Sequence, residues 1–235
     1  MIDVEGLRTR LADVRARIAR AAGRAGRDPA SIRLVAISKT FSADYVRAAA
    51  GAGQVDFGEN KVQEALQKMD ETAGLPIRWH LVGHLQSNKA RKAGARFDVV
   101  QSVDDAGLLR TLDEAAASAG RQMQVLVQVD LAGEATKHGA REEEILPIFE
   151  AAAACRAARI AGLMIIPPAV EDPEAARPYF RALKEVRERL LARGVDALRL
   201  NELSMGMSHD FEVAVEEGAT LVRIGTAIFG SRTYV

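Results

Sequence analysis

The chain has 235 residues, 48% hydrophobic and 27% charged, and its 32 basic and 32 acidic side chains cancel at neutral pH. This balance argues against a broad electrostatic surface for nucleic acid or for an anionic membrane. The apolar runs are far shorter than the ~20 residues of a membrane span, and the first residues lack the apolar core of a secretory signal. The one cysteine, Cys155, has no second cysteine for an internal disulfide bond, which is typical of a reducing compartment. We therefore expect a cytoplasmic protein that binds neither nucleic acid nor membranes.

The first predicted element is an amphipathic helix over residues 3–25. Its apolar residues recur along one helical face, at Leu7, Leu11, Val14 and Ile18. An Asp-Pro pair at 28–29 closes the segment. We interpret its arginines as a solvated face.

Short β-rich segments then alternate with helical segments along the rest of the chain. The predicted strands cover residues 32–38, 55–57, 77–82, 97–101, 124–131, 159–166, 198–203 and 220–224. The predicted helices between them cover residues 43–50, 61–69, 86–93, 106–119, 142–154, 174–192 and 211–217. Such alternation indicates right-handed crossovers and a parallel sheet. We expect an α/β protein with one domain over residues 1–235, a single (β/α)₈ TIM barrel with an extra N-terminal helix. An open doubly wound sheet is the alternative.

A lysine closes the first predicted strand. In a barrel, functional residues gather at the carboxyl ends of the strands, and Lys39 follows an apolar run at such an end. Its ammonium group either extends to solvent or is desolvated and unprotonated, which suits Schiff-base chemistry. The position alone leaves both interpretations open.

Two histidines lie at the end of the third predicted strand. His80 and His84 are four residues apart, which is the spacing of two zinc ligands on a helix. Here the segment is predicted to be a strand, and no cysteine or acidic residue accompanies the pair. We therefore expect no metal site and interpret the imidazoles as core or site-lining groups.

Two turns of small residues follow the seventh and eighth predicted strands. The first holds Ser204 and Ser208, and the second holds Gly225 and Thr226. In many barrels such turns bind phosphate through backbone N–H groups and hydroxyls. Arg223 stands inside the apolar eighth strand, where a guanidinium needs a carboxylate or a ligand as its partner. With the strand-end lysine, these features predict a phosphorylated carbonyl ligand.

Five segments of the sequence, taken in order, resemble the YggS/PROSC family of pyridoxal 5′-phosphate (PLP) homeostasis proteins. They are AISKT at 36–40, FGEN at 57–60, WHLVGHLQSNK at 79–89, GLM at 162–164, and LSMGMS…VRIGTAIFG within 203–230. The resemblance covers nearly the whole chain. It implies a barrel similar to the N-terminal domain of alanine racemase.

The resemblance also implies roles for individual residues. Lys39 matches the lysine that holds PLP covalently as an aldimine, and Arg223 matches the arginine that faces the pyridine nitrogen. The positions that match the phosphate site are Ser204, Ser208, Gly225 and Thr226, and those that match the cofactor lining are Asn60, His80 and Met205. The sequence departs from the family at residues 133–139, which read GEATKHG instead of GEESKSG, and at His209, where an acidic residue is usual. These departures concern regulation by the loop rather than cofactor binding.

The resemblance implies a protein that buffers PLP or delivers it to apo PLP-dependent enzymes, without catalysis of its own. An arginine is always protonated, so it leaves the facing pyridine nitrogen unprotonated and the ring a poor electron sink. A PLP-dependent amino-acid racemase is the alternative, and a lysine Schiff-base aldolase is a third hypothesis. A racemase needs a second base, which alanine racemase takes from a further domain. Only about ten residues follow the last predicted strand, so we expect no such domain here, and we expect a monomer.

Overall fold

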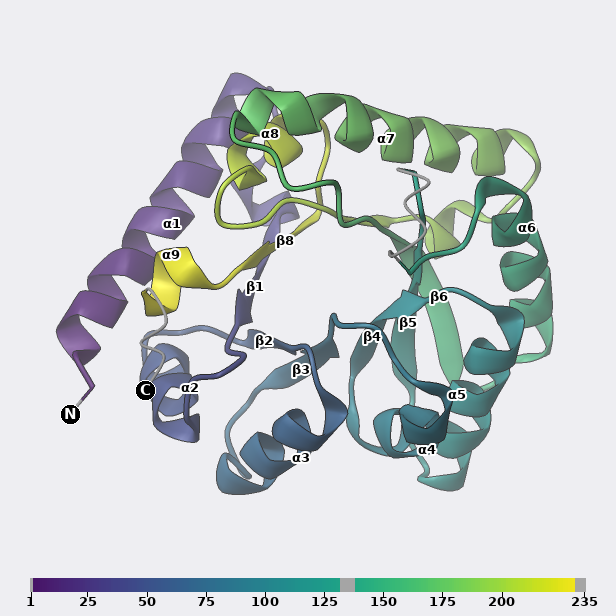
Figure 1. The fold of residues 1–235 in the computed structure, drawn as a ribbon, viewed down its shortest axis with the longest axis horizontal. Coiled ribbons are helices and arrows are strands. Elements are labelled where there is room, and N and C mark those ends of the chain that lie inside the picture. The colour runs from purple at the N-terminus through teal and green to yellow at the C-terminus, as the bar shows by residue number, and fades with distance from the viewer. Residues whose placement is uncertain (1, 132–137, 231–235) are drawn as a thin grey trace.

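The computed structural model describes residues 2–131 and 138–230. Its centre is a closed barrel of parallel strands, in which each strand pairs with the next and β8 pairs with β1 (Figure 1). The strands are β1 Arg33–Ile37, β2 Asp56–Glu59, β3 Arg78–Leu81, β4 Val99–Val103, β5 Met123–Gln128, β6 Ala158–Met164, β7 Glu202–Ser204 and β8 Leu221–Ile224. The predicted (β/α)₈ barrel is therefore confirmed, and the open doubly wound sheet is excluded.

Helices surround the barrel on its outside (Figure 1). They are α1 Val4–Arg24, α2 Ala43–Gly51, α3 Val62–Glu71, α4 Ser87–Arg96, α5 Ala106–Ser118, α6 Glu142–Ala151, α7 Arg177–Ala192, α8 Phe211–Glu216 and α9 Thr226–Phe229. Short 3₁₀ helices occupy Pro29–Ser31, Ala152–Ala154, Pro173–Ala176 and Ala197–Arg199. Within the described part of the chain, no helix has both the length and the hydropathy that a membrane crossing requires.

The additional N-terminal helix, α1, packs along the barrel beside α8 and α9 (Figure 1). Asp3 caps it by accepting a hydrogen bond from the Gly6 N–H, and the predicted apolar face is buried. Its arginines are not simply solvated, which corrects that expectation. Arg17 forms two hydrogen bonds with the Glu212 carboxylate, and Arg10 Nε donates to the Ile228 carbonyl oxygen at 2.8 Å. These contacts attach α1 to the two helices that flank β8.

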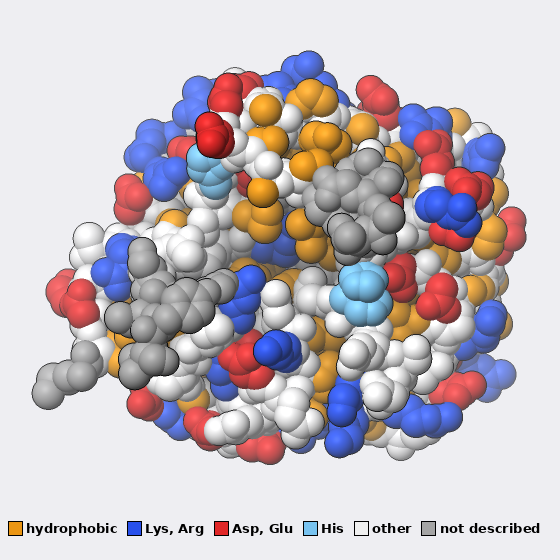
Figure 2. All heavy atoms as spheres, in the orientation of Figure 1, with side chains coloured by type: hydrophobic (Ala, Val, Ile, Leu, Met, Phe, Trp, Pro, Cys, Tyr) orange, Lys and Arg blue, Asp and Glu red, His pale blue; other side chains and the backbone are white. Residues whose placement is uncertain are grey.

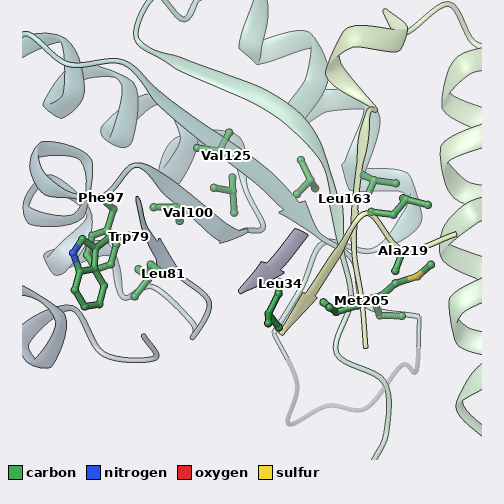
Figure 3. Close-up of a cluster of buried hydrophobic side chains, with 14 of the residues drawn as sticks. Leu34, Trp79, Leu81, Phe97, Val100, Val125, Leu163, Met205 and Ala219 are labelled. Carbon is green, nitrogen blue, oxygen red and sulfur yellow. The ribbon is translucent and has the colours of Figure 1, made fainter. Parts of the chain in front are cut away.

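The strands divide their side chains between two layers because successive residues of a strand point to opposite faces. In β1, Val35 and Ile37 belong to a small apolar cluster inside the barrel, whereas Leu34 and Ala36 belong to the larger cluster shared with the helices. Figure 3 shows part of the larger cluster, including Leu34. The inward positions of several other strands carry polar side chains, so the barrel interior is partly polar.

The largest difference from the sequence prediction is at β7. A strand was expected over residues 198–203, but the strand is Glu202–Ser204 and a 3₁₀ turn occupies Ala197–Arg199. The carboxylate of Asp196 accepts a hydrogen bond from the Leu198 N–H, which stabilises that turn. Leu198 is 73% exposed, so its hydrophobicity contributes little to the core. The short helix α9 was not predicted either.

Candidate functional site

A cavity of about 530 Å³ opens where the carboxyl ends of several strands meet. Six residues predicted from the sequence line it: Lys39, Asn60, Ser208, Arg223, Gly225 and Thr226. The other lining residues are Ile37, Phe41, Val82, Gly83, His84, Ile166, Met207 and His209. Figure 2 shows a hollow near the middle of this face, with basic side chains in and beside it. The volume and the mixed lining suit a small-molecule ligand.

The turn that carries Lys39 is held on both sides by charged groups. The Nζ of Lys68 donates to the Ser38 carbonyl oxygen at 2.8 Å, and the Thr40 N–H donates to Glu64 Oε1 at 2.7 Å. Thr40 has a φ of 71°, a left-handed conformation that a β-branched residue adopts only when its surroundings impose it. These contacts fix the backbone before and after Lys39.

A buried ion pair lies beneath this turn. Lys68 Nζ is 2.6 Å from Glu59 Oε1, and the Ser38 hydroxyl donates to the same carboxylate oxygen at 2.6 Å. Burial raises the pKa of Glu59, and Lys68 acts in the opposite direction. Burial would also raise the pKa of Glu64, but the Thr40 N–H and the charge of Lys68 lower it. The lysine therefore compensates two carboxylates and ties α3 to the end of β1.

The turns after β7 and β8 come together on one side of the cavity. The Gly225 N–H donates to Ser208 Oγ at 3.2 Å, and α9 begins at the next residue, Thr226. A Cβ at Gly225 would lie 3.2 Å from the Ile37 carbonyl oxygen, so a larger residue would push this turn away from β1. Two hydroxyls and backbone N–H groups are thus gathered where an anionic group could be bound.

Arg223 is a buried charged group in the wall of the cavity and is only 4% exposed. Its Nη1 donates to Ser204 Oγ at 2.6 Å and its Nη2 to the Ile165 carbonyl oxygen at 2.7 Å. Burial lowers its pKa to about 10, although Asp210 acts in the opposite direction, so the guanidinium is charged at neutral pH. Among the described residues no carboxylate forms an ion pair with it. Its partners there are a hydroxyl and a carbonyl oxygen, both neutral, so the guanidinium charge is not neutralised by a carboxylate.

Three predicted site residues lie behind the cavity wall rather than in it. His80 is 1% exposed, and Ser204 and Met205 are 0% exposed. The first two face the barrel interior and are hydrogen-bonded there. Met205 belongs to the apolar layer between strands and helices (Figure 3). Their direct contact with a ligand stays a prediction.

Two histidines of the lining, His84 and His209, were not given a cofactor-binding role, although His84 was interpreted as a core or site-lining group. The ring of His84 stacks on that of His138, with centroids 3.4 Å apart, and His84 Nδ1 is 3.9 Å from a carboxylate oxygen of Asp104. Burial lowers the pKa of His84, and His138 shifts it in the same direction. His209 Nε2 lies 2.8 Å from the Glu171 carbonyl oxygen. Both lining histidines follow strand ends closely, so their chain position was the available signal. Of the predicted loop 133–139, residues 133–137 lie outside the described residues.

Comparison with known proteins places this barrel in a family. The family model for the alanine racemase N-terminal domain matches residues 9–233. The pyridoxal phosphate homeostasis protein of Pseudomonas aeruginosa is 45% identical over 224 residues, which are 95% of this chain and 95% of that protein. The protein of the same name from Aquifex aeolicus is 41% identical over 96% of this chain and 98% of its own length. The chain belongs to the family of pyridoxal phosphate homeostasis proteins.

This homeostasis-family barrel is also similar in three-dimensional structure to a solved protein. The structure of PipY from Synechococcus elongatus with PLP bound is 38% identical and superposes with a TM-score of 0.84. It covers 95% of this chain and 100% of the PipY chain. The recognised family and the predicted barrel are thus both confirmed.

Proposed function

We propose that this member of the homeostasis family binds PLP and serves PLP homeostasis by buffering the cofactor or delivering it. The observation that carries the proposal is one strand-end cavity lined by Lys39, by the buried cation Arg223 and by the hydroxyls of Ser208 and Thr226. Relatives over nearly the whole length are named for PLP homeostasis, and PipY has been solved with PLP bound. We take residues 1–235 as one PLP-binding barrel domain.

The covalent part of the proposal concerns Lys39. Bound PLP supplies an aldehyde and an electron-withdrawing ring. The Lys39 amine condenses with this aldehyde and water leaves, so the cofactor is held as a Schiff base that hydrolysis can reverse. The fixed backbone at Ser38 and Thr40 keeps the lysine at the cavity wall, which limits the entropy lost on binding.

The phosphate of PLP is assigned to the turns after β7 and β8. The hydroxyls of Ser208 and Thr226 and the N–H groups at the start of α9 are donors on the same side of the cavity. Hydrogen bonds to a charged acceptor contribute roughly 1.5–3 kcal/mol each. The phosphate therefore supplies much of the affinity and distinguishes PLP from pyridoxal. Asn60, directly after β2, also lines the cavity.

Arg223 is assigned to the pyridine nitrogen. A guanidinium has donors only, so it hydrogen-bonds the ring nitrogen in its unprotonated form. An unprotonated ring stabilises a carbanion poorly, and this favours storage and transfer of PLP over catalysis. We propose a cytoplasmic monomer that passes PLP to apo PLP-dependent enzymes and has no catalytic activity of its own.

The proposal is tested by a transfer assay with PLP-loaded protein and the apo form of a PLP-dependent transaminase. We expect transaminase activity to recover. The PLP-loaded protein alone should convert amino acids at a rate that exceeds the rate of free PLP by no more than a marginal factor. The Lys39→Ala variant, treated in the same way and freed of unbound PLP, should restore little activity. Turnover of an amino acid at an ordinary enzyme rate of about 1–10³ s⁻¹ would instead make the protein a racemase or a related enzyme.

A further inference from the structure

A chain of hydrogen bonds crosses the barrel interior from Arg223 to Asp56. Arg223 Nη1 donates to Ser204 Oγ at 2.6 Å, and Ser204 Oγ donates to Gln101 Oε1 at 2.6 Å. Gln101 Nε2 lies 2.9 Å from His80 Nδ1, and His80 Nε2 lies 2.8 Å from Asp56 Oδ1. This Arg223–Asp56 chain connects side chains from β8, β7, β4, β3 and β2, which are five strands of one barrel.

Every link of the Arg223–Asp56 chain donates in the same direction. A guanidinium has only donors, so Ser204 accepts from Arg223 and has its own proton left for the Gln101 carbonyl oxygen. The amide nitrogen of Gln101 then faces His80, so Nδ1 accepts and Nε2 carries the ring proton. That proton is donated to the Asp56 carboxylate.

The ends of the chain are charged and its middle is neutral. Burial would raise the pKa of Asp56, but hydrogen bonds from His80 and Arg78 lower it to about 2. Burial lowers the pKa of His80 against the opposing effect of Asp56, so the imidazole is neutral at neutral pH. The three middle side chains are at most 1% exposed, so water cannot replace a broken link. Any break leaves a buried polar group without a partner.

We propose that the Arg223–Asp56 chain positions Arg223 and that Gln101 sets the direction of hydrogen-bond donation along the chain. This inference rests on the proposed function. The chain and the Ile165 carbonyl oxygen hold both terminal nitrogens of the guanidinium. Arg223 therefore meets the ring nitrogen of PLP without reorganising. Gln101 lies outside every segment that carries the family resemblance and outside the cavity lining.

The affinities of the Gln101→Leu variant for two ligands test this inference. Leucine fills a similar volume but removes both hydrogen bonds, so Arg223 loses its support. We expect PLP to bind about tenfold more weakly, whereas the analogue with C–H in place of the ring nitrogen, 1-deaza-PLP, changes by less than about twofold. The exposed Gln122→Leu is the matched control and should leave both affinities unchanged.

The outcomes separate the positioning role from the proposed function. If Gln101→Leu binds PLP and 1-deaza-PLP more weakly by the same factor, or if neither affinity changes, the positioning role is overturned while the proposed function stands. Failure of the unsubstituted protein to bind PLP overturns both. Thermal unfolding of each variant shows whether the fold is retained.

The ¹⁵N NMR signals of His80 give a second readout that needs no cofactor. In the unsubstituted, PLP-free protein we expect the ring proton on Nε2. The Gln101→Glu variant replaces the amide donor by a carboxylate acceptor, so it should place a proton on Nδ1. A proton on Nδ1 of the unsubstituted protein contradicts the proposed direction, and this holds even if Gln101→Leu fails to fold.

Discussion

At the residue scale, selectivity for a phosphorylated ligand is assigned to two hydroxyls. The double variant Ser208→Ala with Thr226→Ala removes side-chain donors at the turns after β7 and β8. Since each charge-assisted hydrogen bond contributes roughly 1.5–3 kcal/mol, we expect PLP to bind at least about tenfold more weakly. Pyridoxal has no phosphate and should lose much less, as measured by equilibrium binding of both ligands.

A control for the double variant removes two exposed hydroxyls that do not line the cavity. Thr9 and Ser118 are exposed and donate only to carbonyl oxygens of their own helices. Thr9→Ala with Ser118→Ala should leave both affinities unchanged. If the cavity variant instead loses affinity for pyridoxal and PLP equally, damage to the barrel explains the loss better than a phosphate site.

A single carboxylate should also make stability depend on acid pH. The folded-state pKa of Asp56 is about 2 against an ordinary value of 3.8. A lowered pKa contributes stability that is fully present above pH 4, is about half lost near pH 3 and disappears as the pH falls through 2. The full contribution is about 2 kcal/mol. We expect urea unfolding to show this difference between the unsubstituted protein and Asp56→Asn at pH 6, and a smaller one at pH 3.

The exposed Asp44, which pairs with Arg47 on the surface, provides the comparison. Asp44→Asn should change the unfolding free energy by less than about 1 kcal/mol at either pH. A constant difference between the unsubstituted protein and Asp56→Asn from pH 6 to pH 3 would contradict the lowered pKa of Asp56.

The site could be predicted only in part from single residues. Lys39 and Arg223 stood out because a basic side chain next to or within an apolar strand must either reach solvent or find a partner. Ser204 looked equivalent to Ser208, yet its hydroxyl lies inside the barrel between Arg223 and Gln101. That environment depends on contacts between strands distant in the sequence. Chain position and residue type cannot reveal it.

At the scale of elements, the turn after β1 depends on α3. Lys68→Met removes the cation that compensates Glu59 and the donor to the Ser38 carbonyl oxygen. Breaking a buried ion pair leaves an uncompensated charge, so we expect a loss of about 3–5 kcal/mol in the free energy of unfolding. Weaker PLP binding should accompany this loss because the turn also carries Lys39. Chemical denaturation and PLP titration measure the two effects.

A double variant distinguishes the effect of breaking the ion pair from the effect of changing side-chain volume at residue 68. Lys68→Met with Glu59→Gln removes both charges, so it should recover much of the stability that the single variant loses. The exposed Lys184→Met on α7 should have little effect. If adding Glu59→Gln to Lys68→Met lowers the free energy of unfolding by as much as Glu59→Gln lowers it alone, the two residues are not coupled.

Element types were predictable and some boundaries were not. The alternation of apolar segments identified the eight strands because helices cover the outward face of each strand, and that face is apolar in all of them. The apolar Leu198 and Leu200 extended the predicted seventh strand too far towards the N-terminus, because Asp196 forms a local turn that competes with the sheet. Helix α9 is four residues long and shows too little periodicity to be detected.

At the scale of the whole molecule, barrel closure followed from the number of βα units, but the contents of the barrel did not. Closure brings β8 beside β1, and this places the turn after β8 against the turn that carries Lys39. The same closure brings five polar side chains into the Arg223–Asp56 chain. Alternation along each strand predicts that a residue points inward. It does not predict which inward residues from separate strands meet.

Covalent binding of PLP by Lys39 is measured by reducing PLP-treated protein with borohydride and locating the modified lysine by mass spectrometry. We expect a single major adduct on Lys39. The Lys39→Ala variant should lose both the adduct and the visible absorption band while its circular dichroism is unchanged. An adduct confined to Lys61 or Lys89, or an unchanged absorption band in Lys39→Ala, would overturn the assignment of Lys39.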